Sequence, residues 1–412
     1  MNRPHVLRDT DFRRFFVGQL VSLLGDQASV LAIPLTAVLV LHAGPAQLGL
    51  LTAVGILPSL LFSLSVGAKI DRRGRRRQTM LFADAVRAVA VLSLPITYVV
   101  GHLTLTQLYV VAFVVGTLDV TFAVAYQALL VAMVNRKDYL AANSLLNGSR
   151  SLAEVVGLAL GGALVGLLTA PVALVLNALS FVVSGTQLAR IHPVEPPGDT
   201  STARSVKGGI SWIRGNPAVR TLLLSTATTN LFAFIGNALL VLYASQALGL
   251  NPTVIGLVFG VGAIGGVVGA ATCRRVERRL GLGRTVLLAS FVFPLSMLLY
   301  PAAHGTTLTA ALILGAGEFL AAVAALWFDI SIGAVFAQEI PDQLRSRVAG
   351  AYRTVNHGIR PVGALLGGFL GTQVGLRTAL LVSAVGAIWG ALLCIRPAVL
   401  NLRIEREPLP PS

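Results

Sequence analysis

The sequence predicts an all-α polytopic membrane protein in which twelve transmembrane helices form two pseudo-symmetric six-helix bundles. Three observations support this prediction. Of the 412 residues, 55% are hydrophobic and only 12% are charged, about half the charged share of an ordinary soluble domain, and the mean hydropathy is +0.78. Apolar stretches long enough to cross a bilayer follow one another between short polar turns, and several short motifs recur half a chain later. One core cannot hide this much apolar surface, so lipid must cover part of it.

The predicted spans have the length that a bilayer requires, roughly 17 to 25 residues each. The first six lie near 15–41, 47–68, 80–100, 105–133, 143–168 and 172–189, and the next six near 219–248, 254–273, 285–303, 308–337, 349–371 and 378–395. The connection at 192–216 is rich in Pro, Gly, Ser and Thr and separates the two sets. We therefore predict an N-terminal bundle at 1–191, a cytoplasmic linker at 192–216 and a C-terminal bundle at 217–412.

Positive charge is concentrated in alternate loops. The loops near 69–77 and 274–284 are the most basic, whereas the intervening turns contain only Arg377. By the positive-inside rule, both termini and the basic loops are cytoplasmic. The net charge of +15 is thus an orientation signal, and we expect a multi-pass protein of a bacterial inner or plasma membrane that binds no nucleic acid. Cys273 and Cys394 fall at cytoplasmic helix ends, where reduced thiols are expected.

Three motifs recur in order, which predicts a duplicated half. Pro45-x-x-x-Gly49 recurs as Pro252-x-x-x-Gly256, Arg72-x-Gly74 as Arg279-x-Gly281, and Gly157-x-x-x-Gly161-Gly162 as Gly363-x-x-x-Gly367-Gly368. The spacing between copies is 207 residues for the first two motifs and 206 for the third. Parallel six-helix repeats with a site near the midplane between them are the architecture of major facilitator transporters.

A loop motif resembles the signature of the major facilitator superfamily. It is Gly67-Ala-Lys-Ile-Asp71-Arg72-Arg-Gly74-Arg75-Arg76-Arg77. In that family the acidic residue and arginines latch the two halves together at the cytoplasmic side, and a glycine permits the tight turn. The resemblance thus implies a latch that contains this loop and is joined or braced by Asp84 and Arg87. A plain topology signal in contact with phospholipid is the alternative.

Further motifs resemble the drug:proton antiporter subgroup that contains the enterobactin exporter and macrolide efflux proteins. They are Leu24-Gly25-Asp26, Ala83-Asp84-Ala-Val-Arg87, Ala141-Ala-Asn-Ser144 and Arg347-Val-Ala-Gly-Ala-Tyr-Arg353. The sequence departs from the subgroup at Leu158, where the antiporter motif has a proline. The motif's glycines still allow close helix packing, but the expected kink, and with it part of the case for antiport, is left open.

Ionisable residues near the middle of predicted spans are the candidate functional residues. A charge there costs at least about 2.5 to 3.5 kcal/mol by insertion scales, so each should face a cavity or a partner. They are Asp26, Asp119, Glu154, Glu318 and Arg360. The resemblance implies that the first, fourth, seventh and tenth helices line the cavity. Arg150 and the polar pair Asn230 and Asn237, seven residues apart on one face, complete the candidates for proton coupling or the substrate cavity.

The roles of several candidates have alternatives. Asp26 is the first choice for the proton carrier, with a structural hydrogen bond as the alternative, and Glu154 is the second choice. Asp119 could carry a proton or pair permanently with Arg150, and Glu318 could serve the cavity or have a fixed role.

Two further sets of charges have open roles. Arg150 and Glu154, four residues apart on one helix face, form either a switchable pair or a permanent bridge. Glu154 and Arg360 occupy equivalent repeat positions. Near the cytoplasmic end of the same span as Arg360 lie Arg353 and His357, and for His357 we favour a structural hydrogen bond.

These observations predict a secondary active transporter that exports a drug-like, siderophore or secondary-metabolite small molecule by proton antiport with alternating access. A facilitator or proton-coupled nutrient importer of the same fold is the alternative. A membrane-embedded lipid-processing enzyme would need a nucleophile, metal cluster or nucleotide loop, and no such motif occurs. A non-transporting receptor gains nothing from the charged midplane. We expect no enzyme, no cofactor besides the proton gradient, no metal and a monomer whose partners are substrate, protons and phospholipid.

Overall fold

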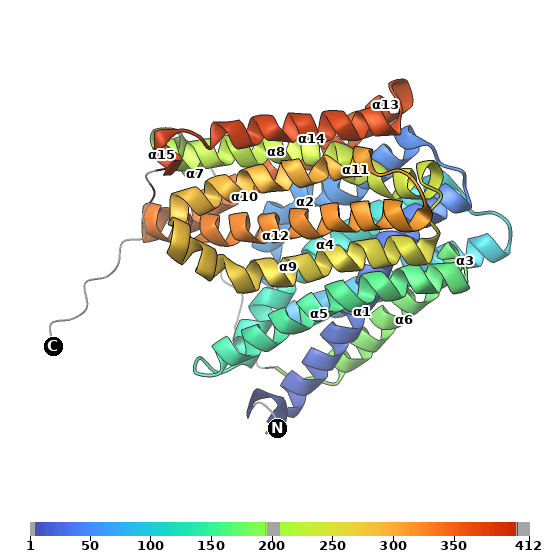
Figure 1. Ribbon diagram of the computed structural model, residues 1–412. Coiled ribbons are helices and arrows are strands. Elements are labelled where there is room, and N and C mark those ends of the chain that lie inside the picture. Colours follow the sequence, from blue (N-terminus) through green and yellow to red (C-terminus); the bar gives the residue numbers. More distant parts are fainter. Residues whose placement is uncertain (1–4, 194, 196–206, 401, 403–412) are drawn as a thin grey trace.

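The computed structural model describes residues 5–193, 195, 207–400 and 402, which form α-helices and short helical turns but no strand (Figure 1). The first half contains η1 (His5–Arg8), α1 (Thr10–Leu39), α2 (Pro45–Arg73), α3 (Arg76–Val99), α4 (Leu105–Met133), α5 (Tyr139–Leu167) and α6 (Ala170–Ala189). The second half contains α7 (Lys207–Gly215), α8 (Pro217–Leu242), η2 (Tyr243–Ala247), α9 (Pro252–Leu280), α10 (Leu282–Met297), α11 (Leu299–Ala302), α12 (Thr307–Glu339), α13 (Asp342–Gln373), α14 (Leu376–Leu393) and α15 (Pro397–Leu400).

Eleven helices of the described chain are long and apolar enough to cross a membrane. The predicted all-α membrane fold is therefore confirmed. The remaining predicted span corresponds to α13, a helix of 32 residues whose basic residues, including Arg353 and Arg360, lower its hydropathy. The last part of the predicted linker at 192–216 forms α7, whose Ile213 packs against Val219 and Val348.

The repeated motifs have equivalent structural roles at helix ends. Pro45 and Pro252 each occupy the first turn of a helix, where proline loses no hydrogen bond. Gly74 and Gly281 each follow the end of a helix with a positive φ, 64° and 83°, a backbone conformation that glycine adopts without a steric penalty. The duplication therefore preserves both the start and the end of α2 and α9.

The bundle has two chemically different ends. At the basic end lie the start of α1, the end of α14 and the basic loops. At the neutral end lie the turns whose only Lys or Arg is Arg377 (Figure 1). One buried apolar cluster at the neutral end includes Leu35 and Val38 from the first half together with Val241 and Ile255 from the second. Toward the basic end, each half has apolar clusters of its own. The halves are thus packed together at the neutral end and separate toward the basic end.

Two glycine seams join the halves at the neutral end. In the α5–α9 seam, a Cβ added to Gly162 would lie 2.5 Å from Cα of Gly256 and 2.6 Å from the carbonyl oxygen of Pro252. In the α2–α13 seam, a Cβ on Gly49 would lie 2.7 Å from Cα of Gly368. All three distances are far below ordinary contact, so only glycine permits these backbones to approach so closely. The seams are repeat-related and close the neutral end from two sides.

The other glycines predicted to pack helices lie within each half. Gly157 and Gly161 face α1, where a Cβ would meet Gln27 Cβ at 2.7 Å and Ala28 Cα at 2.6 Å. In the second half, Gly363 and Gly367 face α8 in the same way. The helix continues through Leu158, whose carbonyl oxygen lies against Gly256 in the α5–α9 seam. A proline is therefore not required for α5 to pack closely on α9.

Candidate functional site

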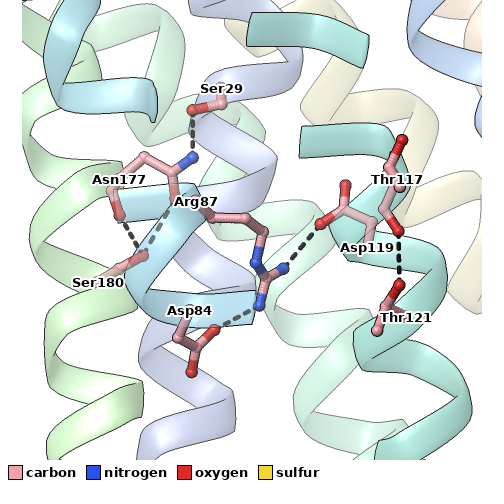
Figure 2. Close-up of polar contacts among 8 residues, drawn as sticks. All are labelled: Ser29, Asp84, Arg87, Thr117, Asp119, Thr121, Asn177 and Ser180. Carbon is pink, nitrogen blue, oxygen red and sulfur yellow. Dashed lines mark hydrogen bonds and ion pairs between the residues drawn. The ribbon is translucent and has the colours of Figure 1, made fainter. Parts of the chain in front are cut away.

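A buried arginine in α3 joins two carboxylates from different positions of the chain (Figure 2). Arg87 is only 2% exposed, and its Nη1 donates to Oδ1 of Asp119 in α4 at 2.7 Å. Its Nη2 donates to Oδ1 of Asp84, which is 1% exposed. The guanidinium also lies 4.4 Å from the ring centroids of both Phe122 and Phe181. Carboxylates and aromatic faces together compensate for the lost hydration of this cation.

Asp26 in α1 adds a third carboxylate to this group. The Asp26 carboxylate interacts electrostatically with Asp119, Arg87 and Asp84. In the described residues, however, no cation lies within ion-pair distance of it. We call Asp26, Asp84, Arg87 and Asp119 the acidic cluster. With one guanidinium for three carboxylates, the fully ionised cluster has an excess of negative charge in the interior of a membrane bundle, where such charge is costly.

Small and polar residues hold α1 against α6 beside this cluster. A Cβ on Gly25 would lie 2.6 Å from Oδ1 of Asn177 and 2.8 Å from Cβ of Ser180. Asn177 Nδ2 donates to Oγ of Ser29 at 2.6 Å, and Ser180 donates to Asn177 Oδ1 at 3.1 Å (Figure 2). The position of Asp26 is therefore set by α1–α6 contacts on both sides of it, the close approach at Gly25 and the hydrogen bond at Ser29.

The structure corrects two sequence-based expectations about these charges. Asp119 pairs with Arg87, and not with Arg150, because α3 lies beside α4 at this depth. Asp84 and Arg87 are buried, belong to the acidic cluster and do not brace the basic loop. Arg150 and Glu154 do pair along α5, with Nε and Oε1 3.4 Å apart, but their side chains are 68% and 43% exposed. That pair is open to its surroundings, and pairs of this kind contribute little to stability.

The basic loop between α2 and α3 contacts its own half. The backbone N–H groups of Arg76 and Arg77 donate to the Glu195 carboxylate at 2.5 and 3.0 Å, and Arg77 Nε donates to the Leu188 carbonyl at 2.8 Å. Gly67, Arg72 and Arg75 make no described contact with the second half, and the Asp71 side chain lies outside the described residues. Among the described residues, the basic loop therefore shows no contact with the second half, and the latch stays a prediction.

A pocket of about 600 Å³ lies within the second half, between α8, α10, α12 and α13. We call it the C-half pocket. Its lining includes two predicted candidates, Asn230 and Arg360, and also Arg353 and His357. His357 Nδ1 lies 3.1 Å from the Arg353 carbonyl oxygen, which fits the structural hydrogen bond that we favoured.

Two other candidates of the second half lie outside this pocket. Asn237 is exposed on α8, and Glu318 packs against Gly262 of α9. Neither is among the residues that line the C-half pocket.

Sequence reasoning missed two residues of the C-half pocket. Asp329 lines it from α12 and Asn356 from α13. Asp329 could have been found by the rule that identified Asp26, because it is an acid inside an apolar span, although it lies closer to the helix end. Asn356 is uncharged and carries no such signal.

No group of three or more His, Cys, Asp or Glu side chains suited to a metal ion occurs in the described part of the chain. Both cysteines, Cys273 and Cys394, are free and buried. Cys394 Sγ lies 3.1 Å from Ser225 Oγ, inside the second half.

Comparison with known proteins agrees with this architecture. The multidrug efflux pump Tap of Mycolicibacterium fortuitum is 24% identical over 381 residues, which is 89% of this chain and 91% of that protein. A bacterial homologue of the iron transporter ferroportin in its inward-facing state superposes with a TM-score of 0.74 at 20% identity, covering 95% of this chain and 98% of that one. The nucleoside transporter NupG also superposes with a TM-score of 0.74, at 11% identity, covering 93% of this chain and 97% of that one. The family model described as Major Facilitator Superfamily matches residues 15–357 and 222–410, and this chain, a membrane transporter, belongs to that family.

Proposed function

We propose that this transporter exports an amphipathic small molecule in exchange for protons, with Asp26 as the proton-carrying residue. The observation that carries the proposal is the acidic cluster, in which Asp26 is the one carboxylate without an ion-pair partner. An excess of negative charge inside a membrane bundle is relieved when a proton or a cationic part of a substrate binds. Competition between the two for one carboxylate is the chemistry that antiport requires.

The orientation follows from the charge distribution. By the positive-inside rule the basic end faces the cytoplasm, so the conformation described here is closed to the outside by the two glycine seams. In alternating access, the halves rock about a midplane site and the seams separate while the basic ends come together. The latch loop with Asp71, Arg72 and Gly74 then meets the second half only in the outward-open state.

A cycle based on these two states couples proton movement into the cell to substrate movement out of it. In the inward-open state, Asp26 releases its proton to the cytoplasm and substrate enters beside the acidic cluster. Rocking opens the neutral end, where a proton from outside displaces the substrate. Each state change is driven by the difference in binding free energy between the two conformations.

Export is favoured by the efflux pumps among the sequence relatives. Tap proteins from mycobacteria are 24 to 25% identical over most of both chains and are named as multidrug efflux pumps. The nucleoside transporter NupG has the same fold at 11% identity, so the fold alone does not select a direction. Substrate entry from the cytoplasm through the separated basic ends agrees with export.

The test is accumulation of ethidium, tetracycline and a ferric siderophore in a pump-deficient bacterium, with and without a protonophore. We expect the wild type to lower accumulation of at least one compound, and we expect both Asp26→Asn and the protonophore to abolish that effect. Asp138→Asn is the matched control, because Asp138 lies at the start of α5 and makes no capping hydrogen bond. Protein levels are compared on immunoblots.

Two outcomes would contradict the proposal. If Asp26→Asn still expels a compound with full protonophore sensitivity, another acid couples transport to protons. If the wild type raises accumulation of these compounds, the protein is an importer.

A further inference from the structure

The C-half pocket contains a set of polar groups that the proposed proton cycle does not use. Its volume of about 600 Å³ lies within the range of small-molecule sites. Phe293 from α10 and Phe328 from α12 contribute aromatic surface, whereas α13 contributes both arginines and the histidine. The pocket thus combines an apolar wall with a polar one, as sites for amphipathic ligands do.

The polar wall is positively charged. Arg353, Asn356, His357 and Arg360 follow one another at positions i, i+3, i+4 and i+7 of α13, so they share one helix face. Neither arginine lies within 4.0 Å of a carboxylate in the described part of the chain. Asp329 opposes them from α12 and interacts electrostatically with Arg360. Two guanidinium groups and one carboxylate leave an excess of positive charge.

Two hydrogen-bond donors in this wall make no well-formed hydrogen bond to the described residues. Asn356 is only 4% exposed. Its Oδ1 accepts from Asn230 Nδ2 at 3.4 Å. Its Nδ2 makes no well-formed hydrogen bond among the described residues, although the side chain interacts with the Tyr352 hydroxyl. Arg360 Nε is also buried without a partner, while the face of its guanidinium lies 5.1 Å from the Phe234 ring centroid. Buried donors without acceptors are rare in folded proteins because they lose their hydration without compensation.

We propose that the C-half pocket binds a carboxylate group of an amphipathic aromatic compound. Arg360 and Asn356 donate hydrogen bonds to the carboxylate oxygens, Arg353 adds positive charge, and the aromatic body of the ligand lies against Phe293 and Phe328. Guanidinium groups recognise carboxylates through parallel N–H donors, which makes arginine well suited to this role. Asp329 repels the same anion and limits its affinity. That such a ligand is transported rests on the proposed function, whereas its binding does not.

The test uses two probes that differ only in charge at one group, 1-naphthylacetic acid and 1-naphthylacetamide. Each is titrated calorimetrically into the purified full-length protein in detergent at pH 7. We expect the acid to bind at least about tenfold more tightly than the amide, the effect of one charge-assisted hydrogen bond. Arg360→Gln should remove this preference, and Asn356→Ser should reduce it.

Asp329→Asn provides a test of opposite sign. It should raise the affinity for the acid severalfold, because Asp329 repels the carboxylate. Misfolding cannot produce such a gain, so the inference can be tested even if Arg360→Gln fails to fold. Arg284→Gln, which changes an exposed arginine in α10, should leave both affinities unchanged. Equal affinities for acid and amide, no measurable binding of the acid, or weaker acid binding in Asp329→Asn would each overturn the inference.

The binding assay also separates this inference from the proposed export. Calorimetry needs no proton gradient and does not depend on Asp26. If the acid preference is absent while Asp26-dependent export is intact, only the carboxylate site is wrong. If the acid preference is present in a chain that exports nothing, only the proposed function is wrong.

Discussion

Replacing Gly162 by alanine should weaken the closed neutral end, because the new Cβ has no room in the α5–α9 seam. It would lie 2.5 Å from Cα of Gly256, 2.6 Å from the Pro252 oxygen and 2.8 Å from the Gly256 nitrogen. Ordinary contacts begin at 3.4 Å, so α5 and α9 must separate by roughly 0.9 Å. All three atoms belong to the backbone, and no side chain can rotate to relieve the overlap.

The free-energy cost of the added methyl group destabilises only the conformation in which the neutral end is closed. Overpacking of this kind costs about 1 to 3 kcal/mol, and it applies only while the seam is closed. Since about 1.4 kcal/mol is a factor of ten in an equilibrium constant, the equilibrium should move roughly 5- to 150-fold toward the state that is open at the neutral end.

A single cysteine in the other seam can report this shift. Ala53 is 4% exposed, between Ala238 and Ala364, where α2 meets α8 and α13. In a chain whose Cys273 and Cys394 have been replaced, Ala53→Cys should react slowly with a membrane-impermeant maleimide. Adding Gly162→Ala should raise the labelling rate several- to about a hundredfold, because the halves move as units.

Gly148→Ala is the matched control, because Gly148 lies in the same helix and a Cβ there meets nothing within 4 Å. Both substitutions gain the same helix propensity, so a difference between them reports only the seam. Equal labelling rates in the two variants, at normal folding, would refute the argument that the glycine seam holds the neutral end closed.

Three further changes test the repeat and the charges. Gly368→Ala should raise the same labelling rate, since its Cβ would lie 3.1 Å from Cα of Ala46 in the repeat-related seam; a decrease would contradict the symmetry of the seams. Arg87→Gln should lower the free energy of unfolding by about 3 to 5 kcal/mol, because it leaves two carboxylates without their cation. Thermal unfolding in detergent measures this change. A melting temperature equal to that of the wild type would contradict the stabilising role of the buried Arg87. A double-mutant cycle on Arg150 and Glu154, measured by the same unfolding assay, should give a coupling energy of about 0.3 to 0.5 kcal/mol. A coupling energy above about 2 kcal/mol would show that the two side chains form a strong ion pair.

The candidate site was only partly predictable. Asp26, Asp119 and Arg360 were identified because ionisable groups are costly inside a span, a property of each residue and its position along one helix. Their partners were predicted less well. Arg87 was assigned to the latch at the basic end although it is buried and pairs with Asp119. Sequence shows how far a residue lies along a helix but not which neighbouring helix faces it.

The uncharged contributors had little sequence signal of their own. Asn356 became a candidate only through its place in the C-half pocket. Gly25 belongs to a motif of the family resemblance, but its packing role became visible only in its contact with Asn177 of α6. Such contacts join residues far apart in the chain.

Composition, hydropathy and the repeat spacing were sufficient to predict the helical membrane fold. A helix in contact with lipid needs apolar residues over its whole spanning length, and this is visible in the sequence. A duplication keeps the spacing between repeated motifs, which is visible there too. The conformation could not be predicted in this way. Whether Gly162 meets Gly256, and whether the latch loop meets the second half, depends on how two rigid halves are oriented, and the same sequence must satisfy both orientations during transport. Pairing across the seams and within the acidic cluster is therefore a property of the assembled bundle.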